Sequence, residues 1–406
     1  MTDIIKLVAV ISLIVIFIVK KWKLEYAIFI ASLLLGIVYQ VNVPQIFKTF
    51  LLTITDEITL RLIGIIILVY IFSGILTKIE GLSNLINSLR GLFKDYRIIL
   101  AFIPALLGLI PMPAGAMFSA PMVKKIGEEA GLNPEENTFI NYWFRHIWEP
   151  IWPMLPALLL FITLLKVSIG EIIRIQFPLF IATVVAGLIW EYKTFKPKAE
   201  AITEKNFLFH LKNLWLCIWP IIFIIFLVIV FKVDILASLS IVIIILLLVN
   251  KDKLNFFSIK EIIKNSFEPG ILILIMGVMF FQKMLITSRA IEIIPEVLTK
   301  SSIPAFFIVF GIPLIMAIIT GISSAPIGIA LPLLLPVMII NGELNLQYAM
   351  LFFSGQFIGL MLSPMHLCLM VSKDYFEADL GQIYKILLFP LGSIALTAFI
   401  LVMIYN

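Results

Sequence analysis

The sequence predicts an all-α integral membrane protein of two inverted repeats, each with five transmembrane helices and one re-entrant helical hairpin. Three observations lead to this fold class. Apolar residues dominate the composition, ten apolar runs follow one another along the chain, and prolines and glycines recur at matching positions in the two halves.

The composition excludes a water-soluble fold. Hydrophobic residues make up 62% of the 406 residues and charged residues 14%, whereas a soluble domain is roughly half apolar and about a quarter charged. The net charge of +5 comes from lysines in short loops, which set membrane topology and do not form a nucleic-acid surface. Cys217 and Cys368 lie in apolar stretches without a paired-ligand spacing, so we expect neither a disulfide framework nor a zinc site.

The ten apolar runs are candidate transmembrane helices, because a bilayer core roughly 30 Å thick takes about 20 helical residues. The runs are 4–20, 24–40, 57–77, 138–163, 175–192, 214–231, 235–250, 269–286, 347–371 and 386–405. The first run has no basic leader and no small-residue cleavage site, and a second run follows at once. We therefore predict a membrane helix there and not a signal peptide.

Interruptions divide four of the apolar stretches. Clusters of Pro and Gly at 111–115 and 321–326 predict the tips of two re-entrant hairpins, at about 98–128 and 303–340. Pro150 and Pro364 predict that the long runs at about 138–163 and 347–371 are broken helices.

Polar segments separate these elements. The segments 45–56 and 258–268 carry polar residues at helical spacing, so we expect helices that lie along the membrane surface. A polar cytoplasmic linker at 193–213 divides the chain into a first repeat, 1–192, and a second repeat, 214–406.

The two halves match at a nearly constant offset. Three matches are 213 positions apart: Gly108 with Gly321, Pro113 with Pro326, and Gly115 with Gly328. Two more are 214 and 212 positions apart: Pro150 with Pro364, and Pro178 with Pro390. Colinear matches of this kind, on top of a matching order of apolar runs, indicate an internal repeat.

The distribution of Lys and Arg predicts the orientation. With the N-terminus outside, only nine basic residues face outward: Lys6, Lys48, Arg61, Lys166, Arg174, Lys232, Lys283, Arg289 and Lys300. Of the 30 Lys and Arg residues, Arg145 lies within a span and the other 20 face the cytoplasm, as the positive-inside rule requires. Five spans in each half, an odd number, then place the halves in opposite orientations, with both termini on the extracytoplasmic side.

Inverted repeats with interrupted helices are typical of secondary transporters, whose substrate site lies near the membrane midplane where the interruptions meet. An interruption frees backbone N–H and C=O groups, which are tolerated only if they are buried in protein or line a wet cavity. The helix N-termini at such a place carry partial positive charge, which suits an anion.

The arrangement resembles the ion-transporter superfamily of elevator-type carriers, which includes gluconate permeases and citrate and dicarboxylate symporters. The resemblance covers nearly the whole chain, and the strings "PMPAGAMFSAPM" and "HIWEPIWPMLP" are similar to those of the DUF401 membrane proteins. It implies a dimerising scaffold, a mobile transport domain and a homodimer. The Ser-Asn-Thr tip motif of the dicarboxylate branch is absent, and Ser323 and Ser324 are the nearest match.

Arg145 and Glu149 are the candidate residues with the sharpest alternatives. Arg145 lies in a span without another positive charge, and its guanidinium can bind a carboxylate through two hydrogen bonds. Glu149 precedes the break at Pro150 and can bind the coupling ion. Alternatively, the two residues, four positions apart on a helix, form a structural ion pair, or Arg145 extends to the cytoplasmic interface.

The other candidates lie near the same interruptions. Candidate substrate-binding residues are Pro113, Gly115, Asn141, Ser323, Ser324 and Ser363 in addition to Arg145, and His146 and His366 are candidate proton carriers beside Glu149. A Na⁺ site is possible near Pro111, Pro150, Gly321 and Pro364, where helix breaks free carbonyl groups. The alternative for the histidines and for Asn141 and Ser363 is hydrogen bonding between packed helices.

The sequence therefore predicts a secondary transporter in the cytoplasmic (inner) membrane. It would move a small organic anion of the carboxylate class, coupled to a Na⁺ or H⁺ gradient, because no ATP-binding motif is present. No cofactor is expected beyond the coupling ion, and the expected partners are the anion and the lipid bilayer, not nucleic acid. The alternatives are a Na⁺/H⁺ antiporter of the same fold and, less favoured, a membrane scaffold or enzyme, since no catalytic cluster is evident.

Overall fold

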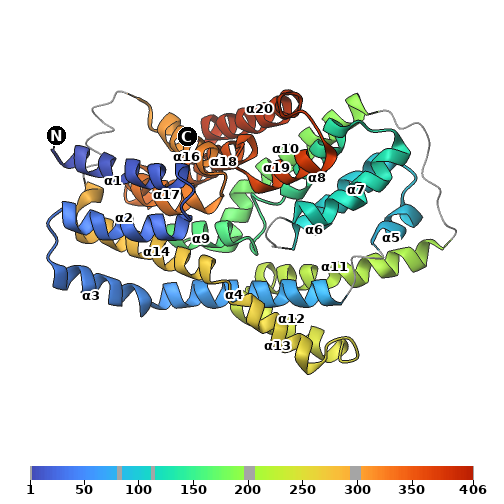
Figure 1. Ribbon diagram of the computed structural model, residues 1–406, viewed down its shortest axis with the longest axis horizontal. Helices are drawn as coiled ribbons and strands as arrows, with labels where there is room; N and C mark the ends of the chain where they lie inside the picture. The colour runs from blue at the N-terminus through green and yellow to red at the C-terminus, as the bar shows by residue number, and fades with distance from the viewer. Residues whose placement is uncertain (1, 80–84, 111–114, 196–205, 293–302, 406) are drawn as a thin grey trace.

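The computed structural model of the protein describes residues 2–79, 85–110, 115–195, 206–292 and 303–405. Most of these residues are α-helical, and the predicted all-α class is confirmed (Figure 1). Five helical segments are long and apolar enough to cross a membrane: Glu57–Lys78, Ile169–Thr194, Phe256–Thr287, Leu346–Phe376 and Leu380–Ile404. The bent pair Phe207–Leu216 and Ile218–Ile229 can be counted as a sixth. The apolar helices indicate a multi-pass membrane protein.

The first half of the chain forms a series of helices. They are α1 (Thr2–Val19), α2 (Leu24–Val38), α3 (Val43–Ile54), α4 (Glu57–Lys78), α5 (Leu85–Leu92), α6 (Tyr96–Gly108), α7 (Ala116–Ala130), α8 (Pro134–His146), α9 (Pro156–Leu165) and α10 (Ile169–Thr194). Side-chain caps fix several of the starts. Asn133 and Ser168 each form a reciprocal capping box, at the first turns of α8 and α10.

The second half follows the same order. It contains α11 (Phe207–Ile229), α12 (Ile235–Val249), α13 (Phe256–Ser266), α14 (Pro269–Thr287), the 3₁₀ turn η1 (Ala290–Glu292), α16 (Ala305–Thr320), α17 (Ser324–Met338), β1 (Ile339–Ile340), β2 (Glu343–Leu344), α18 (Leu346–Leu362), α19 (Leu367–Phe376) and α20 (Leu380–Tyr405). The strands β1 and β2 form a two-residue antiparallel hairpin.

The correspondence between the halves extends to individual residues. Helices α2, α9 and α10 begin and end 211 positions before α12, α19 and α20, as in 235 minus 24. Left-handed backbone conformations fall at the same offset: Lys21 with Lys232, Gly131 with Gly342, and Lys166 with Glu377. Since residues other than Gly rarely adopt a positive φ, the shared turns are an independent sign of repetition.

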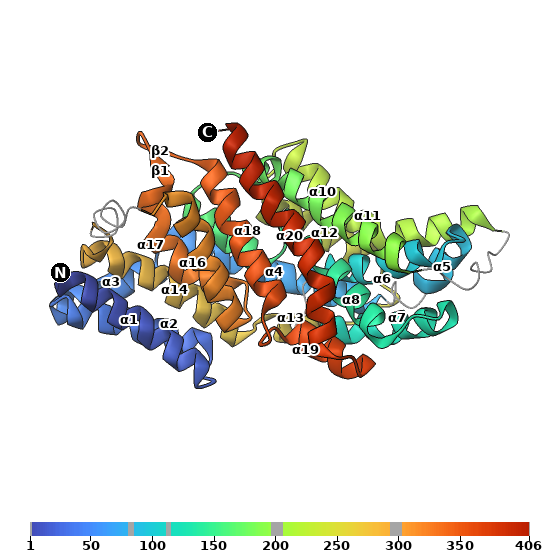
Figure 2. The same cartoon turned by 90° about the horizontal axis from the view of Figure 1, so that it is seen from above.

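The helix contacts between the halves are reciprocal. Helix α2 packs against α14 and α12 against α4, α7 packs against α19 and α17 against α9, and α8 packs against α20 and α18 against α10. Figure 2 shows α6 and α7 on one side of α20 and α16 and α17 on the other. A two-fold relation that exchanges the halves would produce this pattern.

The predicted interruptions are present. Helices α6 and α7 flank the first predicted tip, of which residues 111–114 lie outside the described part of the chain. Helices α16 and α17 flank the second tip, and α8 with α9 and α18 with α19 replace the two long runs. The amphipathic segments predicted at 45–56 and 258–268 are largely α3 and α13. Ten spans, re-entry into the membrane and inversion of the halves stay predictions, because helices such as α2 and α12 have only 15 residues, fewer than the about 20 of a standard span.

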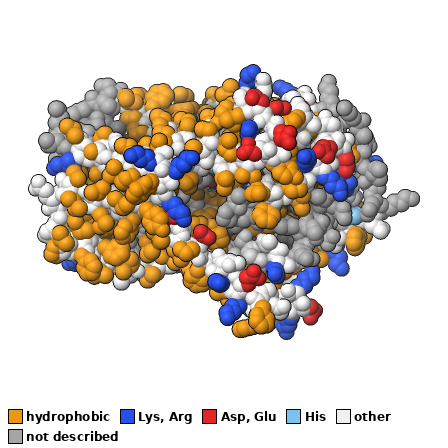
Figure 3. All heavy atoms as spheres, in the orientation of Figure 1, with side chains coloured by type: hydrophobic (Ala, Val, Ile, Leu, Met, Phe, Trp, Pro, Cys, Tyr) orange, Lys and Arg blue, Asp and Glu red, His pale blue; other side chains and the backbone are white. Residues whose placement is uncertain are grey.

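Apolar side chains cover much of the outer surface. They dominate the half of the molecule that contains α2, α3 and α14, whereas charged side chains gather toward the opposite half (Figure 3). Phe47 and Leu52 of α3 are 59% and 51% exposed. A soluble monomer rarely exposes so large a continuous apolar area, so these faces suit contact with lipid.

Close packing of α16 on α18 gives a stability prediction. A Cβ atom added at Gly355 of α18 would lie 2.2 Å from the Phe310 carbonyl oxygen, which is backbone and cannot rotate away. Gly355→Ala should therefore destabilise the protein by about 1–3 kcal/mol through overpacking. Gly311→Ala, in the facing helix α16, has open space and should be neutral or slightly stabilising. Thermal melting of both variants in detergent tests this, and equal melting temperatures would contradict the packing.

Candidate functional site

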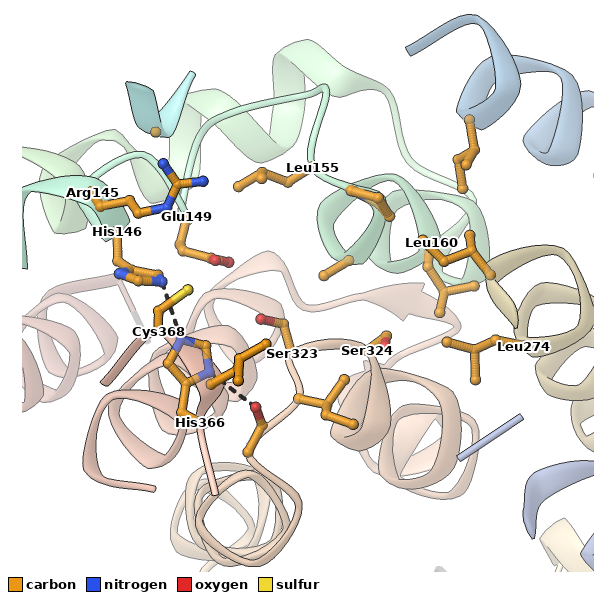
Figure 4. A pocket seen from close by; sticks show the side chains of 18 of the residues that line it. Arg145, His146, Glu149, Leu155, Leu160, Leu274, Ser323, Ser324, His366 and Cys368 are labelled. Atoms are coloured by element: carbon orange, nitrogen blue, oxygen red, sulfur yellow. Dashed lines mark hydrogen bonds between the residues drawn. The ribbon is translucent and has the colours of Figure 1, made fainter. Parts of the chain in front are cut away.

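A cavity of about 350 Å³ lies where the interruptions of the two halves meet. Its polar wall comes from the ends of the broken elements: Gly108, Arg145, His146, Glu149, Gly321, Ser323, Ser324, His366 and Cys368. Its opposite wall is largely apolar and includes Ile66 and Tyr70 of α4 and Leu274 of α14. Figure 4 shows the labelled polar side chains gathered around one space, across from Leu155, Leu160 and Leu274.

Side-chain hydrogen bonds hold the breaks in place. The last carbonyl groups of an α-helix have no partner within the helix and must find one elsewhere. At the end of α6, the indole Nε1 atoms of Trp148 and Trp152 donate to the carbonyl oxygens of Ala105 and Leu109, both at 2.8 Å.

The end of α16 is satisfied in the corresponding way. Ser363 Oγ donates to the Ile318 carbonyl oxygen at 2.6 Å, and His366 Nδ1 lies 2.9 Å from the Gly321 carbonyl oxygen. Ser363 stands 211 positions after Trp152. The two side chains thus occupy equivalent positions, and each donates a hydrogen bond to a carbonyl oxygen near the end of a helix. Gly321 has φ of 66° and closes α16 in the left-handed conformation.

Arg145 is buried next to Gly115, the residue that directly precedes α7. Its side chain packs on Gly115, where an added Cβ atom would overlap the guanidinium, and its Nη1 atom has no hydrogen-bond partner. Glu149 is also buried, with Oε2 unpartnered, and no salt bridge among the described residues joins it to Arg145. Both charged groups therefore face the cavity with unused hydrogen-bonding capacity, which disfavours the alternative of a structural ion pair.

His146 and His366 come together although 220 positions separate them. Their Nε2 atoms are 3.1 Å apart, and the His146 Nδ1 atom lies 2.7 Å from the Tyr142 carbonyl oxygen. Cys368, half-buried, lies beside both: the ligand atoms of the three residues are within 4.8 Å of one another. Figure 4 shows the Cys368 sulfur next to the two imidazole rings.

Ser323 and Ser324 lie at the start of α17 and line the cavity. Ser323 is the N-cap residue of α17, but its side chain makes no capping hydrogen bond. Hydroxyl groups at a helix N-terminus, where the helix dipole is positive, can bind an anion.

Other predicted site residues have structural contacts instead. Asn141 Nδ2 donates to the Ala116 carbonyl oxygen and to Ser372 Oγ, joining α8 to α7 and α19. Ser363 ties its break to α16, and neither Pro150 nor Pro364 lines the cavity. Pro111 and Pro113 lie outside the described residues. Of the three described positions predicted for Na⁺, the structure places only Gly321 at the cavity, where its carbonyl oxygen is engaged by His366.

Comparison with known families found a match that covers nearly the whole chain. The model of a family described as "Protein of unknown function (DUF401)" matches residues 3–405. The chain belongs to the DUF401 family. The match covers nearly every helix described above, in both halves of the chain. No curated protein matches the chain.

Cys368 lines the cavity of this DUF401 protein, but the sequence analysis did not predict a role for it in the site. Its apolar surroundings suggested an ordinary membrane residue, and only the fold brings His146 next to it. The one local signal is the string "HLC", which places His366 and Cys368 two positions apart at the start of α19, directly after the break.

A pair of serine substitutions separates structural from cavity-facing roles. Ser363→Ala removes the donor to Ile318 and the acceptor for the Met365 N–H group. It should cost about 1–3 kcal/mol, because it removes two hydrogen bonds at once and leaves the part-buried Ile318 carbonyl group unpaired. Ser323→Ala should leave stability within about 0.5 kcal/mol, since its hydroxyl makes no capping bond. Melting of the two variants in one detergent checks this, and a larger loss for Ser323→Ala would contradict the assignment.

Proposed function

We propose that this protein is a secondary active transporter of a small organic anion, of the carboxylate class, coupled to a Na⁺ or H⁺ gradient. One observation carries the proposal: a buried guanidinium with an unpartnered nitrogen, Arg145, faces a cavity formed by helix breaks from both halves. Such a cation is expensive to bury and is typical of substrate pathways in membrane proteins.

The cavity has the size and chemistry of an anion site. Its volume of about 350 Å³ lies within the roughly 300–1,000 Å³ of small-molecule sites. Arg145 can bind a carboxylate through two parallel hydrogen bonds, and the hydroxyl groups of Ser323 and Ser324, which line the same cavity, can donate further hydrogen bonds to the anion. Glu149 is positioned to bind the coupling ion, since its free oxygen lies in the same cavity.

The repeated architecture supports alternating access. We take the two halves as inverted repeats, each with five spans and one re-entrant hairpin, in which the hairpins and broken helices form a mobile unit against α4 and α14. Among the described helices, α4 packs against α9 and α14 against α17, whereas the exchanged pairs, α14 with α19 and α4 with α7, have no comparable packing. In an inverted-repeat carrier such asymmetry corresponds to one of two states, open to opposite sides of the membrane. In the other state, α14 would pack against α19 and α4 against α7.

The remaining parts of the proposal follow from the same reading. The excess of Lys and Arg on one side supports an orientation with both termini outside, and we propose the cytoplasmic membrane as the location. The elevator-type mechanism and a homodimer rest on the resemblance to elevator-type carriers.

Gradient-driven uptake into proteoliposomes tests the function. The wild-type protein should accumulate at least one member of a carboxylate panel under an imposed Na⁺ or proton gradient. Arg145→Lys keeps the charge but loses the planar fork, so uptake should fall about tenfold or more at low substrate concentration. Arg174→Lys, at an exposed position of α10, should transport normally.

Two results would contradict this proposal. The first is no gradient-dependent uptake of any tested carboxylate by the wild-type protein. The second is proton flux without organic solute that Glu149→Gln abolishes and that Ser323→Ala and Ser324→Ala retain, which would indicate a Na⁺/H⁺ antiporter.

A further inference from the structure

We propose that His146, His366 and Cys368 form a binding site for a transition-metal cation of the Zn²⁺ class, with an open coordination position facing the cavity. The three residues come from the end of α8 and the start of α19, so the metal would join the two halves of the chain. This site does not depend on the proposed transport function.

The hydrogen bonds of the two histidines determine which nitrogen atoms are free. A carbonyl oxygen only accepts, so His146 Nδ1 donates to Tyr142 and His366 Nδ1 donates to Gly321. With the proton of each neutral ring on Nδ1, both Nε2 atoms present lone pairs. Metal-binding histidines have this arrangement, in which a backbone carbonyl group holds the second nitrogen and fixes the tautomer.

The distance between the free nitrogens fits a shared cation. The two Nε2 atoms are 3.1 Å apart, where two facing lone pairs repel each other unless a cation lies against both. Two nitrogens that bind one tetrahedral zinc ion, each at about 2.0–2.1 Å, lie about 3.3 Å apart. The histidines are therefore already close to the separation that a metal ion requires.

Cys368 supplies a third ligand of a different kind. Its sulfur lies within 4.8 Å of the histidine nitrogens, and a short shift brings it to the about 2.3 Å of a zinc–sulfur bond. Two imidazoles and one thiolate favour Zn²⁺ and related soft cations over Mg²⁺ or Ca²⁺, which prefer oxygen.

The fourth position would be open. Three protein ligands leave one tetrahedral position for water or another ligand, as in catalytic zinc sites. All three residues line the cavity, so this position faces the space that Arg145 and Glu149 share. A divalent cation and Arg145, opposed by a thiolate and the Glu149 carboxylate, leave a net positive charge that suits an anion as the fourth ligand.

Cobalt titration tests the site without any transport assay. Purified wild-type protein, treated with chelator and titrated with Co²⁺, should develop the near-ultraviolet charge-transfer band of a cobalt–thiolate bond, saturating at one equivalent and reversed by Zn²⁺. Cys217→Ser, at the other cysteine of the chain, should keep the band, and Cys368→Ser should lose it. His366→Gln should weaken Co²⁺ binding about tenfold or more, since even a lost outer contact costs that much.

A protection experiment leaves the site residues unchanged. In the Cys217→Ser protein, Zn²⁺ should slow the reaction of Cys368 with a small maleimide at least tenfold, and Mg²⁺ should have no effect. No band in the wild-type protein, a band that persists in Cys368→Ser, or equal reaction rates with and without Zn²⁺ would overturn the proposal. Two histidines that only share a proton would give neither the band nor the protection.

Discussion

The structure depends on how it satisfies helix ends that lie inside the protein. Helices α6 and α16 end within the molecule. Each of their last carbonyl groups would destabilise the fold by several kcal/mol if it had no hydrogen-bond partner there. Trp148 and Trp152 donate to the end of α6, and Ser363 and His366 donate to the end of α16. These donors follow α8 and α18, so each break is tied to the hairpin of its own half.

The same bonds assemble the cavity. Once a break is fixed beside a hairpin end, the side chains next to it are held at one place: Arg145 and Glu149 from the first half, and Ser323 and Cys368 from the second. His366 has a double role, since one ring nitrogen bonds Gly321 while the other faces His146. The stability of the fold and the assembly of the cavity therefore depend on some of the same residues. Matched substitutions such as Ser363→Ala and Ser323→Ala are needed to distinguish the two roles.

Much of the fold could be predicted from the sequence because its signals are local. Pro and Gly stop helices wherever they occur in sufficient density, so the four interruptions were predictable. The amphipathic helices α3 and α13 were predictable because their polar residues recur at helical spacing. The number of transmembrane spans was less predictable, because hydropathy does not show where a helix of 15 residues lies relative to the bilayer. The pairing of His146 with His366 and Cys368 was not predictable, since it depends on how α8 packs against α19.

The central claim is that two opposed repeats build one site, and the orientation of equivalent turns tests it most directly. Lys21 and Lys232 are exposed, lie 211 positions apart and share a left-handed backbone. In a chain whose two cysteines are replaced by Ser, Lys21→Cys and Lys232→Cys can be labelled with a thiol reagent that does not cross membranes. Inverted repeats predict that intact cells label only Lys232→Cys and that inside-out vesicles label only Lys21→Cys. Labelling of both from the same side would contradict the account.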